Sequence, residues 1–153
     1  MAPEPAADAD LHVRRHTVPP ALPPASTGAP FILVVEDDAD VREMLRLLLE
    51  GDGYQVLGAE DGAVALRYLH TTPRPDCILL DIWMPHMGGL AFRLVQQDTP
   101  DLAAIPVIAM SAYRRGPWLD TELQAAAYLE KPFTPEQLLA LLAEVGCGPV
   151  TRR

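Results

Sequence analysis

Apolar residues gather along this chain in five short runs, each of which ends in polar or turn-forming residues. The first run, at residues 31–35, reads FILVV and contains no polar position. Such a continuous, β-branched run is typical of a strand buried on both faces. Four similar runs follow at residues 55–59, 77–80, 106–110 and 126–129. The pattern therefore predicts five short strands.

Between these runs, apolar residues recur at the spacing of a helix. One face of the segment after the first run collects five of them: Val41, Met44, Leu45, Leu48 and Leu49. Asp40 and Glu43 have the spacing of a capping box at its start, and Gly51 and Gly53 end it. Further helices are expected at residues 62–69 and 89–97, between Trp118 and Ala125, and before Gly146.

The last helix carries the strongest start signal in the sequence. Thr134 is a suitable N-cap, Pro135 occupies the first helical position, and Gln137 completes a capping box. With it, the chain reads as five strand–helix units in series. This alternation predicts an α/β fold, an open parallel sheet covered by helices on both faces.

The length of 153 residues fits one domain with its own core. Residues 1–30 hold seven of the sixteen prolines and few large apolar residues, so we expect a Pro-rich disordered tail there. The domain is then expected at residues 31–146, followed by a short C-terminal tail at residues 147–153.

Composition narrows the classes of function. A net charge of −9, with arginines scattered along the chain, argues against nucleic-acid binding. No apolar stretch is long enough for a membrane span or resembles a secretory signal, which makes the cytoplasm the expected location. Two cysteines form no disulfide framework, and neither suggests metal or redox chemistry.

Polar residues follow four of the five predicted strands. They are Glu36 and Asp37 after the first strand, Asp81 after the third, Ser111 after the fourth, and Lys131 after the fifth. Ligands of open parallel sheets bind outside the carboxyl ends of the strands. Taken singly, Ser111 is a common turn former and Lys131 a solvated charge. Lys131 is, however, the only lysine of the chain, and together these residues predict a binding site.

The charge balance of this set indicates its chemistry. Glu36, Asp37 and Asp81 with Lys131 carry −3 + 1 = −2, which suits one divalent cation. Because the set offers only oxygen ligands, it favours Mg²⁺ over zinc. The chain has no Walker-type loop or dinucleotide fingerprint. An aspartate beside Mg²⁺ can instead attack a phosphoryl group directly and form an aspartyl phosphate.

Four segments resemble the receiver domains of two-component response regulators. They are Val34-Val35-Glu36-Asp37-Asp38, Leu79-Leu80-Asp81-Ile82-Trp83-Met84-Pro85, Met110-Ser111-Ala112 and Tyr128-Leu129-Glu130-Lys131-Pro132-Phe133. The resemblance covers about residues 31–145. It implies a flavodoxin-like sheet of order 2-1-3-4-5, Mg²⁺ as the cofactor, and phosphorylation by a sensor histidine kinase or a histidine phosphotransfer protein.

The same resemblance implies a role for each site residue. Asp81 would be the phosphoacceptor and Asp37 a direct Mg²⁺ ligand. Glu36 would act on the metal through water and Trp83 through its backbone carbonyl. The phosphoryl group would be bound by Ser111 and Lys131.

Two further roles follow from position. Tyr128 resembles the family's aromatic switch, which turns inward when Ser111 moves toward the phosphoryl group and remodels the surface around the fourth strand, fourth helix and fifth strand. It can also be simply a strand tyrosine with its hydroxyl in water. Trp83 and Tyr113 are bulky residues expected to flank the phosphoryl group. We therefore expect restricted water access and slow self-dephosphorylation.

The sequence leaves several functions to compare. Little follows Gly146, so a stand-alone receiver is expected, which shuttles phosphoryl groups or binds an unidentified downstream protein. A Mg²⁺-dependent phosphatase with an aspartate nucleophile is an alternative. Such enzymes carry a second aspartate two residues after the first, where this chain has Trp83. A pseudo-receiver that binds partners without phosphorylation would have lost an acid or the lysine, and none is lost here.

Overall fold

The computed structural model describes residues 28–112 and 121–148, which contain a single five-stranded sheet. Its strands are β1 (Phe31–Val35), β2 (Gln55–Ala59), β3 (Cys77–Asp81), β4 (Val107–Ser111) and β5 (Ala127–Glu130). All four neighbouring pairs are parallel, in the order β2-β1-β3-β4-β5. Both the predicted α/β class and the predicted strand order are confirmed.

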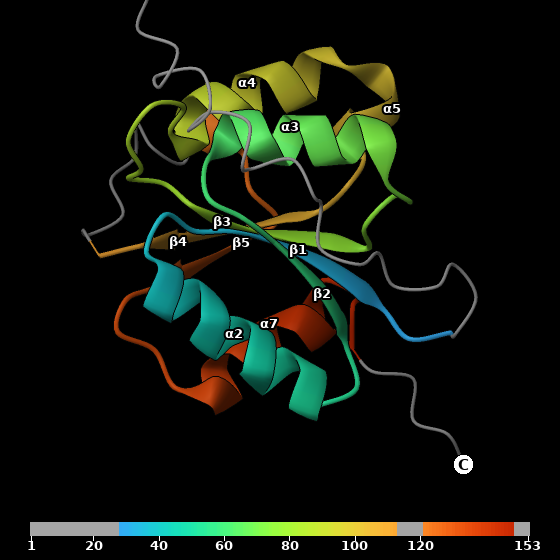
Figure 1. Cartoon of the computed structure of the whole chain (residues 1–153), viewed down its shortest axis with the longest axis vertical. Coiled ribbons are helices and arrows are strands. Elements are labelled where there is room, and N and C mark those ends of the chain that lie inside the picture. Colours follow the sequence, from blue (N-terminus) through green and yellow to red (C-terminus); the bar gives the residue numbers. More distant parts are fainter. Residues whose placement is uncertain (1–27, 113–120, 149–153) are drawn as a thin grey trace, which may run out of the picture.

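Helices cover both faces of this sheet (Figure 1). Their bounds are α2 (Ala39–Gly51), α3 (Gly62–Thr71), α4 (Gly89–Asp98), α5 (Pro100–Ala103) and α7 (Pro135–Glu144). Helices α3, α4 and α5 lie on one face, and α2 and α7 on the other (Figure 1). Residues 121–123 are helical as well, inside the region where a helix was expected.

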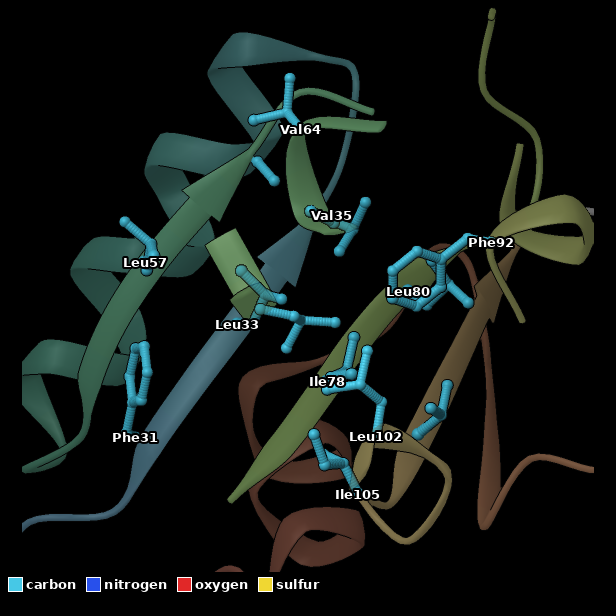
Figure 2. Close-up of a cluster of buried hydrophobic side chains, with 14 residues drawn as sticks. Phe31, Leu33, Val35, Leu57, Val64, Ile78, Leu80, Phe92, Leu102 and Ile105 are labelled. Atoms are coloured by element: carbon cyan, nitrogen blue, oxygen red, sulfur yellow. The ribbon is translucent and has the colours of Figure 1, made fainter. Parts of the chain in front are cut away.

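The core follows from the alternation of side chains along β1. Phe31, Leu33 and Val35 point to the face covered by α3, α4 and α5, where they meet buried residues such as Leu80 and Phe92 (Figure 2). The intervening Ile32 and Val34 belong to a second cluster under α2 and α7. Because every residue of β1 is buried, the strand has no polar face, as its apolar run predicted.

The first helix differs from the prediction in two ways. Its N-cap is Asp38, whose carboxylate accepts hydrogen bonds from the backbone N–H groups of Asp40 and Val41. Asp40 therefore lies inside the first turn, and the predicted capping box at Asp40 is wrong. Met44 was placed on the apolar face, but it is 52% exposed, whereas Leu45 is buried. The face of α2 that is buried against the sheet is therefore narrower than the predicted apolar face and centres on Leu45 and Leu49.

The last helix begins as predicted. Gln137 donates its backbone N–H to Thr134 Oγ1 at 3.2 Å, and Thr134 donates its own to Gln137 Oε1 at 2.9 Å. The short helix α5 was not predicted. The core also extends to Cys147, one residue past the predicted domain end at 146, because its side chain is buried in the cluster under α2 and α7.

Candidate functional site

The acidic residues that follow β1 and β3 meet at the carboxyl edge of the sheet. Carboxylate oxygens of Glu36, Asp37 and Asp81 all lie within 4.8 Å of one another. Glu36 and Asp81 are only 2% and 5% exposed, while Asp37 is exposed to solvent. This contact follows from topology, since β1 and β3 are parallel neighbours whose carboxyl ends share one edge.

Lys131 reaches these acids from the end of the edge strand β5. It follows β5, which is separated from β3 by β4. Its Nζ lies 2.8 Å from Glu36 Oε2 and 3.4 Å from Asp81 Oδ2. A backbone hydrogen bond fixes the position from which the Lys131 side chain starts, because the Lys131 N–H donates to the Ser111 carbonyl at 2.7 Å. The single lysine of the chain thus contacts both buried acids and offsets part of their charge.

The electrostatics of Asp81 reflect its burial. Loss of solvent, together with the nearby charge of Glu36, raises the pKa of the Asp81 carboxyl to about 6, although Lys131 and the backbone N–H of Trp83 act in the opposite direction. Burial alone would lower the pKa of Lys131. The hydrogen bond to Glu36 and the charges of both acids outweigh that effect and raise it. The pocket therefore holds more negative charge than its one cation offsets.

Position 89 must be a glycine because the start of α4 packs directly against the backbone of Asp81 and Ile82. Any Cβ on Gly89 would lie 2.7 Å from the Asp81 carbonyl oxygen and 2.8 Å from Ile82 Cα, closer than real side chains approach. Helix α4 can therefore begin directly against the end of β3 only with glycine at this position. The tight packing fixes the backbone that carries Asp81.

The remaining predicted site residues lie around this cluster. Ser111 ends β4 and is 7% exposed. Trp83 turns its side chain outward, with 51% exposed, while its backbone N–H interacts with Asp81. Tyr113 lies outside the described residues.

Tyr128 is half-buried in β5. It packs against a small cluster of Ile82, Ala109 and Leu123. Its hydroxyl accepts a hydrogen bond of 3.3 Å from the backbone N–H of Ala125. The ring thus packs against Ile82, which follows Asp81, and against Ala109, which lies on the strand that Ser111 ends.

Two residues that hold this region together were not predicted. Arg42 of α2 donates from Nη1 to the Glu36 carbonyl at 2.7 Å. Arg93 of α4 is 7% exposed and donates from Nε to the Leu123 carbonyl at 2.7 Å and from Nη2 to the Gln124 carbonyl at 2.9 Å. The only sequence signal for Arg93 is its helical spacing from Gly89 and Gln96, and two polar side chains at such positions do not normally indicate a buried face.

Among the described residues, no helix combines the length and the apolar character that a bilayer crossing requires.

Comparisons with known proteins agree on one family. A family model described as the response regulator receiver domain matches residues 32–143. The transcriptional regulatory protein SphR of Synechococcus elongatus, named for alkaline phosphatase synthesis, is 37% identical over 130 residues, covering 78% of this chain and 49% of SphR. The phosphate regulon regulator PhoB of Klebsiella pneumoniae is 40% identical over 118 residues, covering 74% of this chain and 50% of PhoB. The chain spans about half the length of these curated relatives.

Solved structures give the same answer. The receiver domain of a signal transduction histidine kinase from Syntrophus aciditrophicus matches with a TM-score of 0.72 at 34% identity, covering 82% of this chain and 95% of that one. Chemotaxis protein CheY4 of Vibrio cholerae matches with a TM-score of 0.71 at 30% identity, covering 76% of this chain and 98% of that one. The chain therefore belongs to the response regulator receiver domain family.

Proposed function

We propose that this chain is the phosphoacceptor of a two-component phosphorelay and that Asp81 takes the phosphoryl group. The observation that carries the proposal is the cluster of three carboxylates within 4.8 Å, with Lys131 Nζ bonded to the buried pair. A receiver domain needs a nucleophilic carboxylate beside positive charge. Asp81 is the buried member of the cluster that ends the central strand β3.

The donor set fits Mg²⁺ as the cofactor. Glu36, Asp37 and Asp81 offer only oxygen ligands, which suit a hard divalent cation. A bound ion would offset the excess negative charge and withdraw charge from phosphoryl oxygens. We assign Asp37 and Asp81 to the metal directly, Glu36 through water, and Trp83 through its backbone carbonyl.

The phosphoryl transfer is a simple displacement. A carboxylate oxygen of Asp81 attacks phosphorus, an O–P bond forms, and the P–N bond to the histidine of the donor breaks, leaving the electron pair on the imidazole nitrogen. Ser111 and the Lys131 ammonium bind the equatorial oxygens. The donor is a sensor histidine kinase or a histidine phosphotransfer protein, and we place the reaction in the cytoplasm.

The proposal includes a change of surface that signals the phosphorylated state to a partner. Ser111 moves toward the phosphoryl group, Tyr128 follows, and the surface around β4, residues 121–123 and β5 changes for a downstream partner protein. The packing of Tyr128 against Ile82 and Ala109 supports this path, because Ile82 directly follows Asp81 and Ala109 lies on β4, the strand that Ser111 ends. Phosphoryl shuttling to a second histidine protein uses the same chemistry. The acidic net charge supports a protein partner over direct nucleic-acid binding.

Intact mass spectrometry tests the central claim. After incubation with a small phosphodonor and Mg²⁺, the wild-type chain is expected to gain one phosphoryl group. Asp81→Asn is expected to gain none, because an amide cannot act as the nucleophile, and removal of Mg²⁺ with a chelator should strongly slow the wild-type reaction. The proposal fails if the wild type gains no phosphoryl group or if the variant gains one equally well.

The phosphorylated state should be long-lived. Trp83, which follows Asp81 closely, and Tyr113 are bulky residues that we expect to limit the approach of water to phosphorus. The expected outcome is release of labelled phosphate over minutes or longer, accelerated in Trp83→Ala. Loss of the label from the wild type within seconds would contradict this expectation.

A further inference from the structure

The only two cysteines of the chain meet in the folded protein. Cys77 begins β3 and Cys147 follows α7, so they are 147 − 77 = 70 positions apart in sequence. Both are free thiols, 0% and 5% exposed, in the same buried cluster under α2 and α7. They lie near enough to each other that each thiol shifts the pKa of the other.

The sulfur of Cys147 lies against the start of β3. Cys147 Sγ donates to the Asp76 carbonyl oxygen at 3.1 Å, and this carbonyl belongs to the peptide bond that joins Asp76 to Cys77. Standard backbone dimensions put the same oxygen about 2.8 Å from the Cys77 Cα, so Cys147 Sγ lies within about 6 Å of that Cα. The Cys147 sulfur is thus placed beside the backbone of Cys77, the neighbourhood that a disulfide between these two residues requires.

The two thiols differ in reactivity. The neighbouring Cys77 lowers the pKa of the Cys147 thiol, while Cys147 and burial raise the pKa of Cys77. Cys147 is therefore the thiol that ionises first, and the thiolate is the nucleophile. Tyr54 supplies a third polar group to the cluster. Its hydroxyl is buried and has no hydrogen-bond partner among the described residues.

We propose that Cys77 and Cys147 form a modification site at which a hydroperoxide produces a reversible intramolecular disulfide. The Cys147 thiolate attacks the peroxide, the O–O bond breaks, and an alcohol or water leaves after taking up a proton, so that a sulfenic acid remains. Cys77 sulfur then attacks that sulfur, the S–S bond forms, and the hydroxyl leaves with the Cys77 proton as water. Two thiols lose two electrons and two protons, and the hydroperoxide is reduced.

The disulfide would act on the fold without touching the carboxylate cluster. Cys77 and Asp81 stand at opposite ends of β3. The bond would close a loop of 147 − 77 + 1 = 71 residues and tie the start of the central strand to the segment that follows α7. Such a cross-link restricts the unfolded chain, so the melting temperature should rise by on the order of 10 °C.

The test uses the whole chain exposed to a small excess of hydrogen peroxide. Intact mass should fall by two hydrogen atoms, a non-reducing digest should join the Cys77 and Cys147 peptides, and dithiothreitol should reverse both changes. The oxidised wild type should melt at a higher temperature than the reduced protein. Phosphorylation of Asp81 is measured separately, so failure of one proposal leaves the other standing.

Two variants separate the proposed cross-link from simple thiol oxidation. In Cys77→Ala, peroxide should leave Cys147 as a sulfenic or higher acid, with added oxygen and no rise in melting temperature. In Cys147→Ala, the buried Cys77 should remain unmodified. The proposal is overturned if wild-type protein keeps both thiols under peroxide, or if it gains oxygen at Cys147 without cross-linking. Cross-linking only between two copies of the chain would also overturn it.

Discussion

At the scale of single residues, Asp81 holds a carboxyl group where burial disfavours the charged form. Its carboxyl is buried beside Glu36, and Lys131 compensates only part of the charge. The polar group is therefore costly unless a cation or proton joins it. Such a group fits the phosphoacceptor role that we propose for Asp81, because a carboxylate fully satisfied by its neighbours would have no oxygen left for a metal ion or for attack on phosphorus.

The raised pKa of Asp81, about 6 against an ordinary 3.8, has a consequence for stability. Between these pH values the folded state binds more protons than the unfolded state, so stability falls as pH rises from about 4 to about 6. Asp81→Asn removes this loss. We expect the variant to be more stable than wild type by on the order of 2 kcal/mol at pH 7.5, with the difference closing near pH 4.

Urea denaturation of both proteins at the two pH values, without divalent cations, measures this difference. Glu60→Gln is the matched control, since Glu60 is exposed, and it should change stability by less than about 0.5 kcal/mol at either pH. A stability difference between Asp81→Asn and wild type that stays the same at pH 4 and pH 7.5 would show that the charge of Asp81 is not its cause.

At the scale of elements, α4 reverses the usual distribution of polarity. It buries Arg93 and Gln96, while Leu94 and Val95 are 49% and 40% exposed. Arg93 Nη1 donates to Gln96 Oε1, and Gln96 Nε2 donates to the carbonyls of Leu102 and Ile105. These polar side chains join α4 to the chain before β4 and before β5. Helix patterns could not predict this, because polar residues normally mark the solvent face.

Arg93→Met should therefore destabilise the fold. The substitution keeps the stem but leaves the carbonyls of Leu123 and Gln124 without their donor, and we expect a loss of about 2–3 kcal/mol. Arg67→Met on the exposed surface of α3 is the control and should change stability by less than about 0.5 kcal/mol. Chemical denaturation decides the outcome. Equal, small effects of the two substitutions would mean that Arg93 contributes little through these bonds.

At the scale of the whole molecule, the sheet order creates the site. The acids of β1 and β3 meet because these strands are neighbours, and Lys131 arrives from β5 past β4. Apolar runs predicted each strand, and the strand-end residues predicted the set of side chains. The distances between these side chains depend on the register of the strands and on the close packing of Gly89 against Asp81. No local sequence pattern encodes either of them.

The sequence by itself determined the α/β class, the caps of the last helix and the identity of the acidic cluster, because these depend on residue type and short-range periodicity. Long-range contacts were decided by the tertiary structure. Asp38 capped the first helix in place of Asp40 since backbone geometry selects among adjacent acids. The cysteines, unremarkable 70 positions apart, became a thiol pair only because β3 and the turn after α7 share one core. Packing brings such residues together, and packing is a property of the whole fold.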